Sequence, residues 1–167
     1  MTPFVATEGM VTGFTTVATS TQAPGFTGTK TDVSLVGAVL RLTDPTVSPI
    51  GTYEFAALID MVTVATRRLE ADINALSYVA VDFVDSRGDV DSWASVDGSS
   101  VDGCDVTLYV ATTNDNPAGT PTWSEWTPFF VCDVTCRAMK FKLVLETDEE
   151  TNNIDISELT VHVKEAV

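Results

Sequence analysis

The 167-residue sequence is poor in histidine, cysteine and positive charge. It holds one histidine, three cysteines and nine lysines and arginines against 24 aspartates and glutamates, so the formal net charge is −15. Affinity for nucleic acid depends on clustered cations that displace counterions from phosphates, and this composition therefore argues against a nucleic-acid partner. It also argues against binding to an anionic membrane surface.

The single histidine leaves little room for histidine-dependent catalysis. His162 follows Thr160 and Val161 in a pattern typical of a strand, where a hydrogen-bonded surface side chain is the expected state. The sequence contains no glycine-rich phosphate loop and no nucleophile elbow, and its many carboxylates single out no pair for glycoside hydrolysis. We therefore expect a protein that is not an enzyme, with no catalytic residue and no cofactor.

The three cysteines are too few for a disulfide framework, so reduced thiols are expected at Cys104, Cys132 and Cys136. A Cys132–Cys136 bridge would need a turn between the two residues. Zinc is not expected, because the one histidine lacks ligand-spaced neighbours. No uninterrupted apolar run is long enough for a transmembrane helix, and the N-terminus lacks the pattern of a signal peptide. These features predict synthesis in a cytoplasm and no membrane insertion.

What the sequence does contain is a repeated alternation of apolar and polar residues, typical of strands with one buried face. Residues 67–76 fit a helix as well as a strand, and the neighbouring strands favour a strand. Turn formers cluster at residues 44–51 and 114–121. We predict an antiparallel, jelly-roll-like β-sandwich of about eight strands over residues 31–167. The alternation is clearest in residues 53–59, 78–83, 106–110, 139–146 and 158–164.

Residues 1–30 show no clear period and are predicted to form an irregular N-terminal arm. The arm is too hydrophobic for a simple solvated linker. It is equally compatible with a segment that packs against a neighbouring subunit and with an extra strand of the same domain. As an attachment arm it would use its large apolar side chains, which are Phe4, Met10, Phe14 and Phe26.

Residues 85–105 form a long segment rich in Asp, Gly and Ser. A solvated acidic loop is favoured over a calcium site, because the EF-hand order of ligands is absent. If the loop held a metal, its first ligand candidates would be Asp85, Asp89 and Asp91. The triplet Arg87-Gly88-Asp89 is associated with integrin ligands, but chance explains it better. As candidate surface or receptor contacts in this segment we single out Trp93, Arg87 and Asp97.

The other two tryptophans, Trp123 and Trp126, are three residues apart. In a strand they would face opposite sides of the sheet. Exposed indoles stack on sugars or anchor protein partners, whereas buried ones pack the sandwich. Packing is favoured for this pair, and the role of Trp93 is left open.

The stretch from 111 to 145 resembles a domain of tailed-phage tail proteins, including host-specificity, tail-tip and fibre proteins. The resemblance extends over residues 48–165, and its densest part is a turn followed by a strand start. At residues 132–137 the sequence departs from the family pattern. The family domain often ends a longer chain, whereas a methionine precedes this one closely, which favours a small separate subunit. The motif residues are Asn114, Asp115, Pro117, Gly119, Pro121, Trp123, Trp126 and Arg137.

The resemblance implies a structural virion protein, either a tail, fibre or surface-decoration subunit, which docks through residues 1–30 and displays the β-sandwich. The implied location is the virion, after synthesis in the host cytoplasm. The implied partners are other virion proteins, further copies of the chain, with a trimer suited to a fibre, and a glycan or protein of the host surface. The alternative hypothesis is a carbohydrate-binding module without catalytic activity, and a hydrolase ranks far below both.

Overall fold

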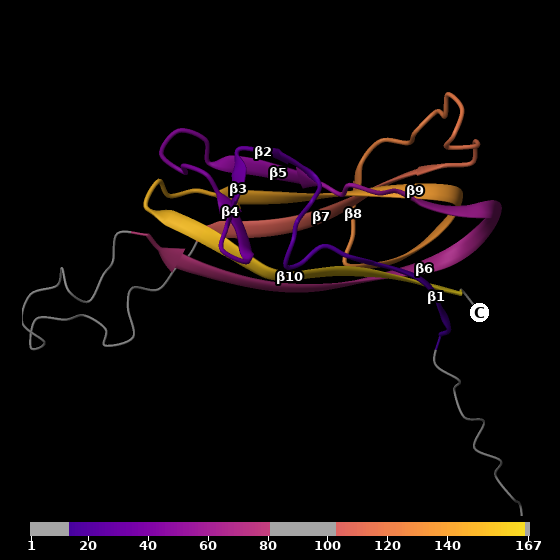
Figure 1. The fold of residues 1–167 in the computed structure, drawn as a ribbon, viewed down its shortest axis with the longest axis horizontal. Helices are drawn as coiled ribbons and strands as arrows, with labels where there is room; N and C mark the ends of the chain where they lie inside the picture. Colours follow the sequence, from indigo (N-terminus) through magenta and orange to yellow (C-terminus); the bar gives the residue numbers. More distant parts are fainter. Residues whose placement is uncertain (1–13, 81–102, 166–167) are drawn as a thin grey trace, which may run out of the picture.

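The computed structural model describes residues 14–80 and 103–165, and every regular element in them is a β-strand (Figure 1). The predicted all-β antiparallel fold is confirmed, although with ten strands rather than about eight. Nothing in these two ranges qualifies as a helix of membrane-spanning length and hydropathy. The strands are β1 (Thr16–Thr21), β2 (Thr29–Thr31), β3 (Val33–Val36), β4 (Val39–Leu42), β5 (Ile50–Glu54), β6 (Ile59–Val79), β7 (Cys104–Thr113), β8 (Thr127–Pro128), β9 (Val131–Thr147) and β10 (Asn152–Glu165).

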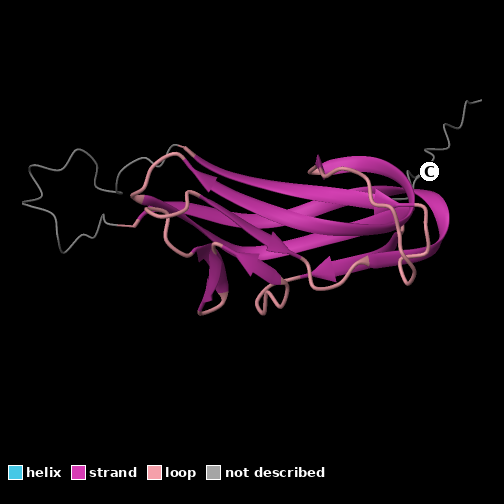
Figure 2. Ribbon diagram, turned by 90° about the horizontal axis from the view of Figure 1, so that it is seen from above, coloured by secondary structure: helices cyan, strands magenta, loops and turns pink. Residues whose placement is uncertain are grey.

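The strands form one continuous sheet in the order β2-β5-β9-β6-β10-β4-β3, with β1 on the edge of β10 and β7 paired to both β8 and β9. The sheet folds over on itself. One layer contains β2, β5, β7 and most of β9, and the other contains β10 and most of β6 (Figures 1 and 2). The two layers remain connected because β6 curves from one into the other. The first half of β6 pairs with the first half of β9, and its second half pairs with β10.

The core lies between the layers and follows the predicted alternation. In β9, Met139, Phe141, Leu143 and Leu145 are at most 1% exposed, and in β10 the side chains of alternating apolar residues are equally buried. Aromatic rings extend through this core with neighbouring centroids 5.5 to 5.8 Å apart, a spacing at which each pair adds about 0.5–1.5 kcal/mol beyond area burial. The order of these rings is Phe26, Tyr53, Phe55, Phe141 and Phe129.

Residues 67–76 lie within β6, so the strand favoured for this ambiguous stretch is confirmed. The alternation predicted for residues 53–59 is interrupted, because β5 ends at Glu54 and β6 begins at Ile59. The register of β6 against β9 then shifts between Asp60 and Ala65, which produces a bend. The strand expected over residues 78–83 ends at Val79, Ala80 lies in a turn, and residues 81–83 lie outside the described residues.

Of the two alternatives left open for the N-terminal segment, its described part follows the second, in which it adds strands to the same domain. Residues 16–21 form β1 on the edge of β10, and residues 29–31 form β2 on β5. Phe26 is 0% exposed and belongs to the core, so it is no attachment contact. Phe14 is 41% exposed, with the Arg68 guanidinium 4.9 Å from its ring centre. Most side chains of β1 are exposed, which explains why its sequence shows no clear apolar period; Phe4 and Met10 lie outside the described residues.

The N-terminal segment is held to the core by the hydroxyl of Tyr53. This hydroxyl donates to Gln22 Oε1 at 2.7 Å and accepts the N–H of Gly28 at 3.0 Å. Burial raises the pKa of Tyr53, and the Gly28 bond opposes that rise only in part. A Cβ at Gly28 would lie 2.0 Å from the carbonyl oxygen of Glu54, so only glycine allows this close approach.

Replacing Tyr53 by Phe should therefore destabilise the protein. The change leaves the Gly28 N–H and the Gln22 carbonyl without their partner, which costs about 1–3 kcal/mol. Chemical denaturation with an unchanged m-value would measure this loss. Tyr109→Phe is the matched control, because no hydrogen bond of that hydroxyl is found in the described residues, and it should change stability by less than about 0.5 kcal/mol. Equal effects of the two substitutions would contradict the role given to Tyr53.

Candidate functional site

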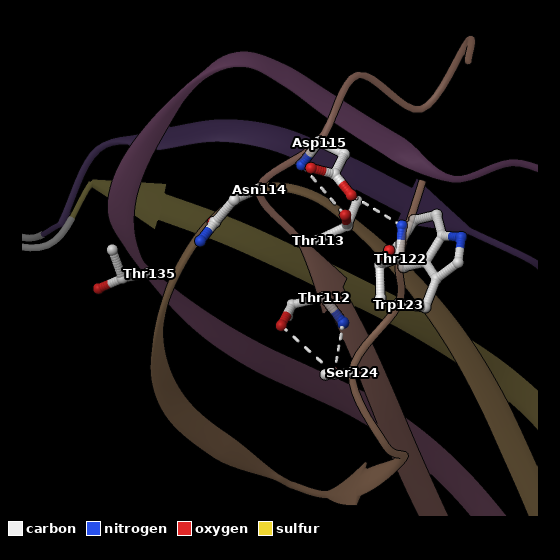
Figure 3. A pocket seen from close by; sticks show the side chains of 8 residues that line it. All are labelled: Thr112, Thr113, Asn114, Asp115, Thr122, Trp123, Ser124 and Thr135. Atoms are coloured by element: carbon white, nitrogen blue, oxygen red, sulfur yellow. Dashed lines mark hydrogen bonds between the residues drawn. The ribbon is translucent and has the colours of Figure 1, made fainter. Parts of the chain in front are cut away.

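The candidate site lies at the turn that the sequence motif predicted. After β7 the chain forms a loop over residues 114–126 and returns along the outer edge of β7, where Ser124 N–H donates to the Thr112 carbonyl at 2.9 Å. A pocket of about 340 Å³ lies between this loop and β9. Asn114 and Thr135 stand on one side of it and Trp123 on the other (Figure 3). Its lining consists of Thr112, Thr113, Asn114, Asp115, Thr122, Trp123, Ser124 and Thr135.

The loop is held by hydrogen bonds of its own polar residues. Asp115 Oδ2 accepts the N–H of Thr122 at 2.8 Å, and the Asp115 N–H donates to Thr113 Oγ1 at 3.1 Å. Asn116 closes a tighter turn, because its carbonyl accepts the Gly119 N–H and its Oδ1 accepts the Ala118 N–H. Side chains of this kind stabilise turns by bonding to nearby backbone groups. The motif therefore specifies a loop of defined shape rather than a reactive group.

Arg137, the last residue of the motif, joins this loop to the bend of β6. Its Nε lies 3.2 Å from Asp60 Oδ1, and its NH2 group donates both to Asp60 Oδ2 at 3.4 Å and to Asn116 Oδ1 at 3.1 Å. The same carboxylate accepts the N–H of Val62, which adopts a φ of 67° that β-branched residues rarely take. The hydrogen bonds from Arg137 and then Val62 lower the pKa of Asp60.

A cluster of aromatic rings and lysines adjoins the pocket on the outer face of β7 and β9; we call it the aromatic–lysine cluster. Lys140 Nζ lies 4.8 Å from the ring centre of Trp123 and 5.0 Å from that of Trp126. Lys142 Nζ lies 4.6 Å from Trp126 and 5.4 Å from Tyr109. These are cation–π distances. The cluster consists of Tyr109, Trp123, Trp126, Lys140 and Lys142.

The two indoles do not face opposite sides, since both lie against Lys140. The reason is that residues 121–126 form no strand, so a period of two does not apply to them. Both indoles are half-buried. They cover the outer face of the sheet instead of facing the core. On this outer face Ala111 and Ala138 are also buried, at 1% and 0% exposure.

The structure brings some predicted residues together and leaves others undescribed. Asn114, Asp115 and Trp123 line the pocket, and Arg137 anchors the loop beside it. Sequence reasoning missed the pocket residues Thr112 and Thr135 and both lysines of the cluster; the lysine spacing of two on the outer face of a strand was the only signal. The residues singled out in the acidic segment, which are Asp85, Arg87, Asp89, Asp91, Trp93 and Asp97, lie outside the described residues.

His162 and the cysteines lie away from this pocket. His162 Nε2 is 2.9 Å from Asp72 Oδ2 and its Nδ1 is 3.4 Å from Thr19 Oγ1, so it is hydrogen-bonded as expected. All three cysteines are free. Burial raises the pKa of Cys132 and Cys136, which keeps both as neutral thiols, and the strand between them contains no turn. Residues 14–80 and 103–165 place no three His, Cys, Asp or Glu side chains where they could hold one metal ion.

The site thus offers hydroxyl and amide groups, the Asp115 carboxylate, one indole wall and two nearby ammonium groups. Such an arrangement can hydrogen-bond a polar ligand and pack against its apolar face. Compared with known proteins, the chain matches no family model, no curated protein and no solved structure.

Breaking the Arg137 contact should return the Asp60 pKa toward its ordinary value of 3.8. A carboxyl whose pKa is lowered by folding stabilises the fold fully above its unfolded pKa, and that stabilisation is lost as pH falls through the lowered value. In wild-type protein, carboxyl ¹³C shifts should therefore show Asp60 titrating below pH 3.8, and Arg137→Gln should move the titration upward.

The matched control is Arg41→Gln, which removes an arginine paired with Asp155 and should leave Asp60 unchanged. Glu70, whose pKa is lowered chiefly by its hydrogen bond from Lys164, provides an internal reference that should stay constant in the Arg137 variant. An Asp60 titration that does not respond to Arg137→Gln would show that the arginine does not hold this carboxylate.

Proposed function

We propose that the chain is a structural, non-catalytic subunit of a tailed-phage particle, in the tail, in a fibre or on the particle surface, and that it presents a binding surface there. The observation that carries the proposal is the role of the motif residues. The residues that produce the resemblance to phage tail proteins form a loop beside a pocket, and hydrogen bonds of Asp115 and Arg137 hold this loop in place. A binding loop positioned on a rigid sheet is a common arrangement for recognition.

Charge supports the same proposal. A net charge of −15 keeps copies of the chain soluble and apart until a specific interface forms. Weak binding by each copy suffices on a particle, because many copies raise the effective concentration of binding sites at a host surface. A homo-oligomer of cyclic symmetry, such as the trimer of a fibre, would group several pockets in one place.

The positions of the chain ends support attachment at one end of the domain. Thr15 accepts a backbone hydrogen bond from Glu165 at 2.9 Å, so the described N-terminal and C-terminal residues emerge together (Figure 1). Along the length of the domain the 114–126 loop lies at the same end as the chain ends, but it projects from the layer opposite β1 (Figure 1). With Phe26 in the core, the attachment segment is reduced to the residues before β1, with Phe4, Met10 and the exposed Phe14 as its contacts.

The second candidate function, a carbohydrate-binding module, is favoured by one specific observation. The pocket is lined by threonine and serine residues, the amide of Asn114 and the carboxylate of Asp115, and it is bordered by an indole. Sugars are recognised by this combination of hydrogen-bonding groups and an apolar ring face. The two functions are compatible, since a virion subunit can carry a carbohydrate site.

Two truncations test the attachment segment. Removing residues 1–13 should leave a folded domain, because every described strand begins later, but the product should no longer enter particles. Removing residues 1–30 should also disrupt the fold, because β1, most of β2 and the buried Phe26 are lost. Circular dichroism and thermal unfolding would measure the fold, and mass spectrometry with immunogold labelling of purified particles would measure incorporation.

The full-length chain, detected on the particle surface by the antibody used for immunogold labelling, is the positive control. The proposal predicts label on tails, fibres or capsids and none on particles made with the 1–13 deletion. Finding the full-length protein only free in host cells would contradict the virion function. Normal incorporation of the deletion product would contradict the attachment segment alone.

A further inference from the structure

The starting observation is that Lys140 and Lys142 have no anionic partner among the described residues. Most other cations there are paired, as Arg41 is with Asp155 and Arg137 with Asp60. The two ammonium groups of the aromatic–lysine cluster instead contact only aromatic rings, at 4.6 to 5.4 Å. Among the described residues no ion pair joins Lys142 to Glu54, its cross-strand neighbour on β5, so in a chain with a net charge of −15 the two adjacent lysines remain available to an outside anion.

The two lysines adjoin the pocket across Trp123, although neither lysine lines it. Trp123 belongs to both the pocket and the cluster, since it lines the pocket and lies 4.8 Å from Lys140 Nζ. The pocket contributes polar groups of Thr112, Asn114 and Ser124, of which the Thr112 and Ser124 hydroxyls also bond to each other. It also includes the carboxylate of Asp115, which would repel an anion, so the anionic group of a ligand belongs on the lysine side of Trp123.

The chemistry of the pocket and the adjoining lysines matches one class of ligand. Hydroxyls of a sugar can bond to threonine, serine and asparagine side chains, and the apolar face of a sugar ring can pack on an indole. An acidic substituent, either a carboxylate or a phosphate, would then meet the ammonium groups and form charge-assisted hydrogen bonds. At about 340 Å³ the pocket lies near the lower end of the range for small-ligand sites, about 300–1,000 Å³, so a short saccharide segment fits.

We propose that the pocket and the aromatic–lysine cluster together bind an acidic saccharide, with the sugar ring at Trp123 and its anionic group at Lys140 and Lys142. The inference deepens the proposed function, on which it rests, by naming the ligand class of the displayed surface. Single-stranded nucleic acid also combines stacking bases with anions, but its binding requires a positively charged groove along the backbone. Two lysines in so acidic a chain do not provide one.

The test compares an acidic sugar with its neutral counterpart on the full-length protein. The probes are 3′-sialyllactose and lactose, a trimer of galacturonic acid with its methyl ester, and octathymidylate for nucleic acid. Binding is followed by the indole N–H signals of a ¹⁵N-labelled sample. Each acidic sugar should bind about tenfold or more tightly than its neutral counterpart, as expected for one hydrogen bond to a charged group. The largest shifts should belong to Trp123 and Trp126.

Variants assign this preference to the lysines. Lys140→Met with Lys142→Met keeps an unbranched apolar side chain, one atom shorter and without the ammonium group, and should abolish the preference for the acidic sugar, while weak neutral binding remains. Lys140→Arg with Lys142→Arg retains the charge and should keep the preference, which distinguishes lost recognition from lost folding. Lys30→Met is the control, because Lys30 aligns with the core residues Tyr53 and Leu143 and therefore lies on the face of the sheet opposite to Lys142.

The outcomes separate this inference from the virion function. Equal affinity for acidic and neutral sugars, absence of binding to all four sugars, or stronger binding of octathymidylate would each overturn the inference. If the protein is found in particles but fails these assays, the proposed function stands and the inference is contradicted. If the protein prefers acidic sugars but is absent from particles, the ligand class stands and the virion function is contradicted.

Discussion

Strand β9 is the element on which the rest of the structure depends. It is the only described strand that pairs with β5, β6 and β7. Because its side chains alternate, one face places Met139, Phe141 and Leu143 in the core, and the other presents Lys140 and Lys142 to the tryptophans. A shift of one residue in its pairing would exchange the two faces. The same register thus sets the hydrophobic core and the proposed binding surface.

The pocket arises where β9 changes partners. Ala138 is the first residue of β9 that pairs with β7, at Thr113, and the residues of β9 before it pair only with β6. After β7 ends at Thr113 the chain reverses direction, and the turn-forming residues 114–121 make this reversal possible. Arg137 stands next to Ala138 and bonds both to the loop and to the bend of β6. Arg137, at the point where β7 separates from β9, therefore holds the loop that lines the site in place.

The sequence was informative where the signal is local. Alternation identified the faces of β7, β9 and β10, and the clustered turn formers located the loop at residues 114–121. It was uninformative where the result depends on pairing between distant segments. Nothing local in residues 16–21 indicates that they lie on β10, and Phe26 looks the same in sequence whether it is buried or exposed. The contact of Lys140 with both tryptophans depends on a loop that folds back over the sheet, which spacing cannot reveal.

The central claim is that the register of β9 places the two lysines beneath the indoles while its alternate residues fill the core. Nuclear Overhauser contacts in ¹³C,¹⁵N-labelled protein test it most directly. The account predicts contacts from the ε-methylene protons of Lys140 to both indoles, contacts from those of Lys142 to Trp126, and ring-current upfield shifts for both lysines. Ordinary exposed-lysine shifts without such contacts, or indole contacts from Met139 instead, would contradict it.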